Sequence, residues 1–168
     1  MNESYAEAGA KRGKTASSYL IMGAMILGIL LLIFVGTGFL GSIATFIASI
    51  LVVGCIYLFP RFNVEYEYVY CDGQLDFDKI SGNAKRKTQL RIDFDKVEMI
   101  APVKSHSLDS LNHNVNLVTK DFTSRNADAK VYAIIYRGEK ETLKILFEPT
   151  EKMLACIKQK FPRKISEL

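Results

Sequence analysis

Residues 15–60 read TASSYLIMGAMILGILLLIFVGTGFLGSIATFIASILVVGCIYLFP, and this stretch decides the fold. It contains no Asp, Glu, Lys or Arg, so the 22 basic and 18 acidic residues of the 168-residue chain all lie outside it. A water-soluble domain exposes charge every few residues, whereas a membrane-spanning helix needs about 20 consecutive apolar residues. The stretch therefore predicts insertion into a membrane and excludes a wholly soluble fold.

The charge-free stretch is too long for one membrane span. At about 1.5 Å per residue, a single helix over 15–60 would exceed twice the roughly 30 Å hydrocarbon core of a bilayer. Gly36-Thr37-Gly38 divides it into 17–35 and 39–59, each near the length of one span. The sequence therefore predicts a two-helix transmembrane hairpin. We expect Gly41, Ala44 and Ala48 to form a small-residue face for close helix packing or for association with further copies of the chain.

Basic residues next to the apolar stretch predict its orientation, because Lys and Arg are retained on the cytoplasmic side. Three of them precede the first span and one follows the second: Lys11, Arg12, Lys14 and Arg61. We therefore expect a multi-pass cell-membrane protein with two spans. A cytoplasmic tail, residues 1–14, precedes the hairpin, and a cytoplasmic domain, residues 61–168, follows it. The three cysteines, Cys55, Cys71 and Cys156, lack the paired spacing of a disulfide framework and suit a reducing compartment.

Two secreted alternatives are disfavoured by the length of the apolar stretch. The apolar region of a secretory signal is about 7–15 residues, far shorter than 15–60. Val52-Val53-Gly54-Cys55 loosely resembles the lipidation motif of lipoproteins, but apolar residues continue on both sides of Cys55. We therefore expect the hairpin to be retained.

Residues 61–168 show the alternation of half-buried strands. From Phe62 to Tyr70 every even position is apolar or aromatic, while 63, 65 and 67 are polar. Asp72-Gly73 predicts a tight hairpin turn. Further strands are predicted around 75–77, 88–94, 97–100, 115–118, 131–136 and 143–147. The strand at 131–136 is apolar on both faces, so we expect it to be central in the sheet. Residues 104–129 otherwise read as a long irregular connection.

The last element changes period. Met153, Leu154, Ile157 and Phe161 recur at helical spacing, Pro149 suits a first helical turn, and Pro162 ends the helix. The sum is a mainly-β domain of six to seven antiparallel strands followed by one amphipathic α-helix. Its 19 basic and 16 acidic residues give too small a net charge to indicate a nucleic-acid partner.

This order of elements resembles the bacterial pleckstrin-homology-like (PH-like) domains. Residues 70–75 are similar to their first hairpin, 90–97 to a strand entering a short turn, and 147–149 to the approach to the C-terminal helix. The resemblance implies a bent antiparallel sheet or partial barrel, capped by that helix, over 62–161. The whole chain is similar to a family of small two-span bacterial membrane proteins of unknown function, through 100–103, Ser105-His106 and 162–164.

The resemblance also bears on lipid binding. Phosphoinositide-binding relatives carry basic residues in the first hairpin loop, whereas Cys71-Asp72-Gly73 is short and acidic. The basic residues of the domain are densest elsewhere, in a predicted turn. A candidate membrane-surface contact is therefore made of Lys79, Lys85, Arg86 and Lys87, at about 1 kcal/mol for each basic residue near anionic headgroups. A turn that only contacts solvent explains the same residues.

Two sets of metal-ligating residue types are better explained without a metal. His106, Asp109 and His113 would align on a helix, but Ser and Asn around them are poor helix formers and indicate a polar loop. Asp76-Phe-Asp78 and Asp93-Phe-Asp95 lack the Gly and closing Glu of a calcium loop. They fit strand ends with Phe77 and Phe94 in the core. We predict no metal site and no cofactor.

The sequence contains none of the common catalytic motifs, which predicts a protein that is not an enzyme. The juxtaposition of two spans with an alternating-strand domain favours a membrane-anchored interaction module, whose cytoplasmic PH-like domain binds a protein partner or the membrane surface. The alternative is an accessory subunit of a larger membrane complex, such as a transporter, that works through its hairpin. The expected partners are the lipid bilayer and a protein in the membrane or cytoplasm.

Overall fold

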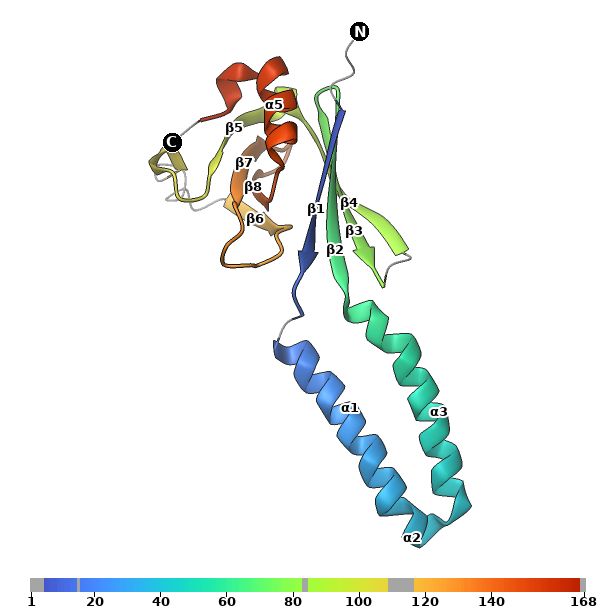
Figure 1. Ribbon diagram of the computed structural model, residues 1–168. Coiled ribbons are helices and arrows are strands. Elements are labelled where there is room, and N and C mark those ends of the chain that lie inside the picture. The colour runs from blue at the N-terminus through green and yellow to red at the C-terminus, as the bar shows by residue number, and fades with distance from the viewer. Residues whose placement is uncertain (1–4, 15, 83–84, 109–116, 167–168) are drawn as a thin grey trace. The chain divides into compact units, whose positions relative to one another are not determined.

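The computed structural model describes residues 5–14, 16–82, 85–108 and 117–166 (Figure 1). The chain forms two compact units. One comprises Met1–Arg12, Glu65–Ile80 and Arg86–Leu168 and contains all the strands except short end segments; the other comprises Gly13–Val64 and Ser81–Lys85 and is helical.

The helical unit is a hairpin of apolar helices. Helix α1 spans Ala16–Phe34, the short α2 spans Gly36–Leu40, and α3 spans Ser42–Leu58, followed by the 3-10 helix η1, Phe59–Phe62. The chain reverses at Gly41, whose φ of 58° lies in the left-handed region that glycine adopts readily. The interruption was expected at Gly36–Gly38, but those residues are helical. The helical segments therefore differ from the predicted 17–35 and 39–59.

The two long helices pack through small side chains on α3. Ala44, Ala48 and Cys55 are its buried residues, whereas α1 has none. A Cβ atom added at Gly36 would lie 3.1 Å from the Ala44 Cβ, so glycine permits the close approach. Two of the three residues expected to form the packing face, Ala44 and Ala48, do so. Gly41 instead makes the turn.

Within the described residues, one helical stretch is long and apolar enough to cross a membrane. It is Ala16–Phe39, with a mean hydropathy of 2.6 and no buried residue in its most apolar window. Ser42–Leu58 is equally free of charge but has only 17 residues.

The β-rich unit contains two four-stranded sheets. In the first, the order is β1 (Tyr5–Arg12), β2 (Val64–Cys71), β3 (Gln74–Ser81) and β4 (Lys85–Asp93). β1 and β2 run in opposite directions (Figure 1). Residues 1–14 were predicted to be a tail, so strand β1 was not predicted from the sequence. Lys85–Lys87, expected in a turn, begin β4.

The second sheet has the order β5-β7-β8-β6. Its strands are β5 (Val97–Pro102), β6 (Leu117–Asp121), β7 (Tyr132–Arg137) and β8 (Thr142–Phe147). β5 and β8 pair antiparallel with β7, whereas β6 pairs parallel with β8. The prediction of antiparallel pairing is therefore correct for most of the fold and wrong for β6. The described strands number eight instead of six to seven, and they form two four-stranded sheets where one bent sheet or partial barrel was expected.

Aromatic side chains join the two sheets. The ring of Tyr68 on β2 lies 5.6 Å from that of Phe77 on β3 and 5.7 Å from that of Phe147 on β8, measured between centroids. All three residues are fully buried. On the other face of the second sheet, a smaller core contains Ala101, Leu108, Ala133 and Ile135. β7 is therefore covered on both faces, which confirms the prediction of a central strand.

Helix α5, Glu151–Lys160, buries Met153 and Ile157. Thr150 caps it by accepting a hydrogen bond from the Met153 N–H, so Pro149 precedes the helix instead of lying in its first turn. The helix also contacts β1, whose inward residues are Ala6, Ala8 and Ala10. Three alanines leave room for a helix against this strand, and their small size is why its alternation is weak in the sequence.

Candidate functional site

Arg12 joins β1 to a distant part of the β-rich unit. Its guanidinium donates hydrogen bonds to the Tyr66 hydroxyl at 3.0 Å, the Asp121 carboxylate at 2.6 Å, the Asp121 carbonyl at 3.1 Å and the Thr123 carbonyl at 3.2 Å. It also lies 4.9 Å from the centre of the Tyr66 ring. The side chain is only 17% exposed. Arg12, expected to set membrane orientation, is therefore also a structural residue that fixes the N-terminal strand.

Asp121 completes this polar cluster, at the end of β6. Partial burial alone would raise the pKa of its carboxyl group. Hydrogen bonds from the Thr123 N–H and hydroxyl and from Arg125, with the charge of Arg12, outweigh burial and lower the pKa below its usual value. The carboxylate is therefore ionised at neutral pH and balances the charge of Arg12.

The other residues expected to set the orientation lie in different surroundings. Lys11 forms an exposed ion pair with Glu65 at 3.2 Å. Lys14 is half-buried between β1 and α1. Arg61 lies in η1, and its side chain is outside the described atoms.

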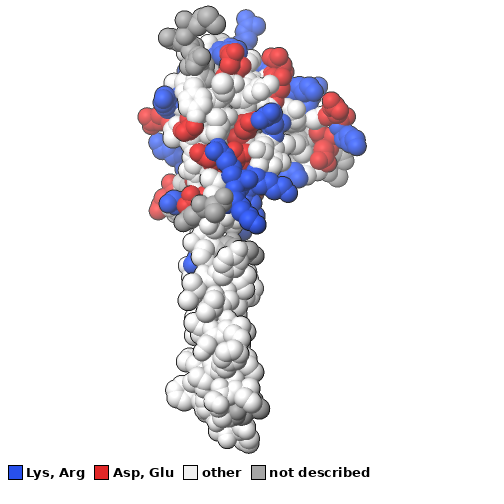
Figure 2. All heavy atoms as spheres, turned by 90° about the vertical axis from the view of Figure 1, so that its right-hand side faces the viewer, with Lys and Arg blue, Asp and Glu red and all other residues white. Residues whose placement is uncertain are grey.

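The predicted membrane-contact residues do not form one uniform basic surface. Arg86 is held by Asp78 at 2.6 Å and by Glu67 at 2.7 Å. The hydrogen bond to Asp78, with Glu67 beside it, raises the pKa of the Arg86 guanidinium. Lys79 is half-buried on β3, while Lys85 and Lys87 are exposed on β4. On the face that contains these strands, basic side chains gather in one group, with acidic side chains beside it (Figure 2). The carboxylates reduce the attraction of this face for anionic lipid.

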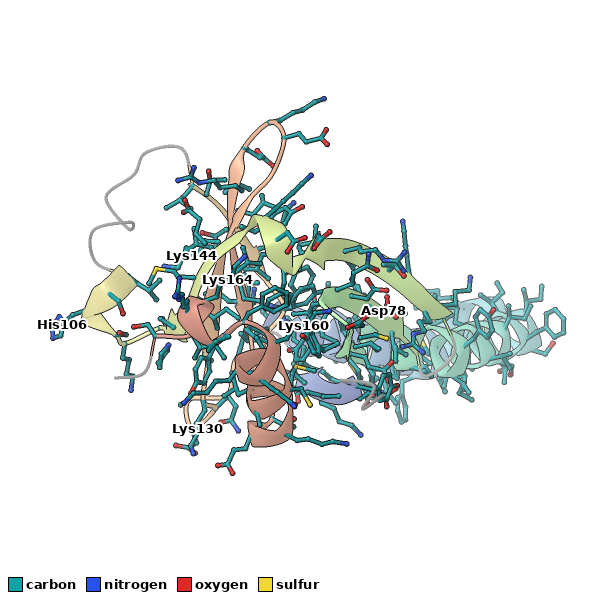
Figure 3. All side chains as sticks on the ribbon, turned by 90° about the horizontal axis from the view of Figure 1, so that it is seen from above. Asp78, His106, Lys130, Lys144, Lys160 and Lys164 are labelled. Atoms are coloured by element: carbon teal, nitrogen blue, oxygen red, sulfur yellow. The ribbon has the colours of Figure 1, made fainter. Side chains whose placement is uncertain are left out.

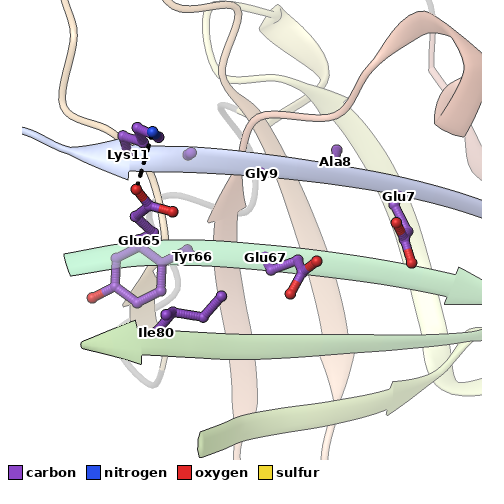
Figure 4. Close-up of a pocket in the computed structure, with 9 residues that line it drawn as sticks. Glu7, Ala8, Gly9, Lys11, Glu65, Tyr66, Glu67 and Ile80 are labelled. Atoms are coloured by element: carbon purple, nitrogen blue, oxygen red, sulfur yellow. Dashed lines mark ion pairs between the residues drawn. The ribbon is translucent and has the colours of Figure 1, made fainter. Parts of the chain in front are cut away.

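Carboxylates also line a groove along β1 and β2. The groove has a volume of about 350 Å³ and is lined by Glu7, Gly9, Glu65, Glu67 and Ile80, among others (Figure 4). Lys11 is its cation, and it is paired with Glu65. A Cβ atom at Gly9 would lie 3.3 Å from the Tyr66 carbonyl oxygen, so glycine allows the two strands to approach closely.

A second groove lies beside α5. It has a volume of about 380 Å³, and its lining includes Pro102, Tyr132, Leu154, Ala155 and Ile165. These residues come from the end of β5, the start of β7, the outward side of α5 and the segment after the helix. The groove is therefore mainly apolar, in contrast to the groove along β1 and β2.

The residues considered as metal ligands have other roles where they are described. Asp76 binds Arg91 through both carboxylate oxygens at 2.6 Å, and Asp93 accepts a hydrogen bond from the Asp95 N–H. Phe77 and Phe94 are fully buried, as predicted. Asp93–Asp95 lies at the end of β4, whereas Asp76–Asp78 lies within β3 and Asp78 is buried, so the prediction of a strand end with outward carboxylates is wrong for that segment. His106 lies at the surface in the 3-10 helix η3, His106–Leu108 (Figure 3), whereas Asp109 and His113 fall outside the described residues. No group of three ligand-type side chains gathers within the described part of the chain.

Two polar groups are buried without a hydrogen bond of normal geometry to the described residues. They are the Tyr70 hydroxyl and one carboxylate oxygen of Asp78. Burial, with the nearby charge of Asp72, raises the pKa of Tyr70 to about 12. The Tyr70 phenol is therefore neutral at physiological pH. By contrast, Tyr68 donates its hydroxyl proton to the Phe122 carbonyl at 2.5 Å.

The arrangement of two sheets and a C-terminal helix agrees with a comparison of the sequence with known families. The family described as Bacterial PH-like domain (DUF6106) matches residues 2–167. The chain belongs to this family. No curated protein and no solved structure matches it. PH-like domains are generally non-catalytic and act as interaction modules.

Strand β1 is the first strand of this PH-like domain, and it changes which loop is the first connection between strands. The resemblance described from the sequence took Cys71-Asp72-Gly73 as the first hairpin of the domain. In the structure β1 precedes that hairpin and pairs with β2, so the first connection is residues 13–63. The short acidic loop Cys71–Gly73, which disfavours lipid binding, is therefore the second connection of the domain. The apolar helical segment is an insertion between the first two strands of this PH-like domain.

Proposed function

We propose that this PH-like protein is a membrane-anchored interaction module, held at the cytoplasmic face of the membrane by a two-span hairpin. The observation that carries the proposal is the pairing of β1 with β2 across the helical insertion. Because these strands are neighbours, the chain must leave the β-rich unit after Arg12 and return to it at Val64. An apolar segment that starts and ends on one side of a membrane crosses it an even number of times.

The lengths of the helices support two crossings. Ala16–Phe39 would extend about 36 Å and Ser42–Leu58 about 25 Å, against a hydrocarbon core of roughly 30 Å. The second is short for a span, but η1 continues it with Phe59 and Pro60. The Thr37 hydroxyl donates to the Ile33 carbonyl at the end of α1 at 2.6 Å, and the Ser49 hydroxyl donates to the Thr45 carbonyl of α3 at 2.9 Å, so neither hydroxyl needs water.

The N-terminal strand supports retention of the hairpin. An apolar helix near an N-terminus also has the composition of a secretory signal. Cleavage after such a signal would remove β1, its alanine contact with α5 and all four hydrogen bonds of Arg12. The domain therefore gains stability only if the segment before the hairpin stays attached.

The charge distribution favours a protein partner over the membrane surface. Of the four basic residues considered for lipid contact, Arg86 is already paired with two carboxylates. The apolar groove beside α5 and the carboxylate-lined groove along β1 are both better suited to a polypeptide than to anionic headgroups. The finer function that we infer is protein recognition next to the membrane.

Cysteine accessibility tests the topology. Cys71 is exposed, whereas Cys55 is buried in α3, so a variant with Cys55→Ser and Cys156→Ser leaves one reactive thiol. With a membrane-impermeant maleimide, we expect Cys71 to react only after the cells are opened. In a matched variant that also carries Cys71→Ser, a cysteine introduced by Gly38→Cys should react in intact spheroplasts. Labelling of Cys71 in intact spheroplasts would overturn the orientation, and protection of the cysteine at 38 would overturn the two crossings.

The alternative function, an accessory subunit acting through its hairpin, has one supporting observation. No residue of α1 is buried, so the apolar surface that does not face α3 is available to lipid or to another membrane protein. Replacement of residues 16–58 by an unrelated two-span hairpin separates the alternatives. Proteins that still co-purify with the exchanged chain bind the PH-like domain, and loss of all of them would favour the accessory subunit.

A further inference from the structure

The edge of β5 already pairs with a residue from outside the sheet. β5 is the terminal strand of the second sheet, so one row of its backbone groups has no neighbouring strand within that sheet. Ile165 forms an isolated parallel bridge with Ile100, and the Ser166 N–H donates a hydrogen bond to the Ile100 carbonyl at 2.8 Å. Two residues that follow α5 therefore make the kind of backbone contact by which proteins bind extended peptides.

A side-chain site accompanies this backbone contact. The groove beside α5 is lined by Ile165 and Ser166 on one side and by Leu154 and Ala155 of the helix on the other. α5 directs Met153 and Ile157 into the core, which leaves Leu154 and Ala155 beside the groove. Strand addition supplies affinity through the backbone, and a neighbouring apolar groove supplies selectivity for a side chain.

After α5, residues 161–164 are held by more contacts than Ile165 and Ser166. Phe161 stacks on Phe94 with 5.2 Å between ring centres, and the Lys164 ammonium donates to the carbonyls of Phe94 and Asp95. By comparison, the Ile165–Ser166 segment has one backbone hydrogen bond and a hydroxyl contact of 3.2 Å between Ser166 and Ser107. This segment can leave the β5 edge without loss of the contacts that hold Phe161 and Lys164.

We propose that the β5 edge and the adjoining groove bind an extended segment of a partner protein, and that Ile165–Ser166 occupies this site until the partner displaces it. The segment runs parallel to β5, donates a backbone N–H to the Ile100 carbonyl and places an aliphatic, preferably β-branched, side chain where Ile165 lies. The chain's own sequence Arg163-Lys164-Ile165-Ser166 is the example of such a ligand. The inference rests on the proposed function, since it assigns the surface by which the module recognises its partner.

The test uses the full chain in a detergent micelle and a fluorescent peptide with the sequence of residues 162–168, PRKISEL. Two variants release the internal segment: Ile165→Asp removes its apolar side chain, and Ser166→Pro removes the N–H that Ile100 accepts. If the segment covers the site about nine-tenths of the time, release should tighten peptide binding about tenfold, because apparent affinity scales with the accessible fraction. A peptide with Asp in place of Ile should not bind.

A blocking variant and a matched control locate the site. Ala155→Arg fills the groove from an exposed position on α5 and should abolish binding in a released chain, whereas Ala127→Arg, exposed in the β6–β7 connection, should not. Any of three results would overturn the proposal. The first is an unchanged affinity for the peptide in the released variants that fold. The others are peptide binding that survives Ala155→Arg and the absence of saturable peptide binding to every chain. Self-association of the released chains, measured by mass photometry, would assign the site to a second copy and overturn it as well. None of these results affects the cysteine labelling, so the topology is judged separately.

Discussion

Replacing Arg12 by lysine separates the two roles that this residue combines. The substitution keeps the positive charge that we expect to direct membrane orientation. It removes the planar guanidinium that reaches Tyr66, Asp121 and Thr123 at the same time. A lysine ammonium has three donors around one nitrogen and cannot span these acceptors. We therefore expect Arg12→Lys to loosen β1 without changing topology.

The size of the effect follows from the hydrogen bonds that are lost. Arg12 makes four of them, and its side chain is 17% exposed while that of Asp121 is 29% exposed. Hydrogen bonds to charged groups contribute about 1.5–3 kcal/mol, and neutral ones about 1 kcal/mol. If the lysine ammonium keeps both contacts with Asp121 and loses those with Tyr66 and Thr123, counted at about 1 kcal/mol each, the cost is about 2 kcal/mol. That corresponds to roughly a 30-fold larger open fraction of the strand.

Amide hydrogen exchange measured by mass spectrometry on a peptide covering residues 5–12 reports this opening directly. We expect about 30-fold faster exchange in Arg12→Lys than in the wild type, if exchange is limited by the open population. Lys14→Gln is the matched control, because it removes a cation two residues further along the chain without removing a hydrogen bond to β6. Unchanged exchange in Arg12→Lys, or an equal change in Lys14→Gln, would refute the structural role of Arg12.

Two further predictions concern titratable groups. Folding lowers the pKa of the Asp121 carboxyl group. The ionised carboxylate therefore stabilises the fold above its ordinary pKa of about 4, and this stabilisation is lost as pH falls through the lowered pKa of the folded state. Asp121→Asn should remove this part of the acid dependence of thermal unfolding. The pKa of Tyr70 is raised to about 12, so its contribution is complete below pH 10 and is lost as pH rises through 12. The buried Tyr70 hydroxyl lacks a hydrogen bond of normal geometry, so Tyr70→Phe should leave the melting temperature at pH 7 equal or higher. The variant should also show a smaller fall of the melting temperature in alkali. A markedly lower melting temperature at pH 7 would contradict this prediction.

The local signals in the sequence predicted most of the β-rich unit. Asp72 and Gly73 both have positive φ, 45° and 94°, as the predicted tight turn requires. Alternation placed Tyr66, Tyr68 and Tyr70 on one face, and all three are buried. These predictions succeeded because each depends on neighbours a few residues apart.

The predictions failed where the deciding contact is distant in sequence. β1 was missed because alanine has weak strand propensity, and its strand becomes stable only beside β2 and α5. β6 was recognised as a strand, but its parallel pairing with β8 was not. The hairpin turn was placed at Gly36–Gly38, where three weak helix formers occur, yet the required backbone reversal is made by Gly41.

The same limit applies to the candidate sites. The functional residues proposed from the sequence were clusters of like charge, such as Lys85-Arg86-Lys87. Arg86 is paired with Asp78 on the adjacent strand, so it is less available to anionic lipid than its place in a basic cluster suggested. The contact between Ser166 and Ile100 joins positions with no shared motif. The one signal available for Arg12 was its position at the end of an alternating segment, Tyr5–Arg12.

The sequence by itself determined that the chain has one apolar, charge-free segment and one alternating-strand domain with a C-terminal helix. Composition and periodicity suffice for this, because they record which residues can leave water. Only the tertiary structure decided that the segment before the hairpin belongs to the domain after it. That decision depends on backbone pairing between β1 and β2 and on the hydrogen bonds of Arg12 to Asp121, 109 residues away. Such contacts form only when folding brings the partners together and removes their polar groups from water.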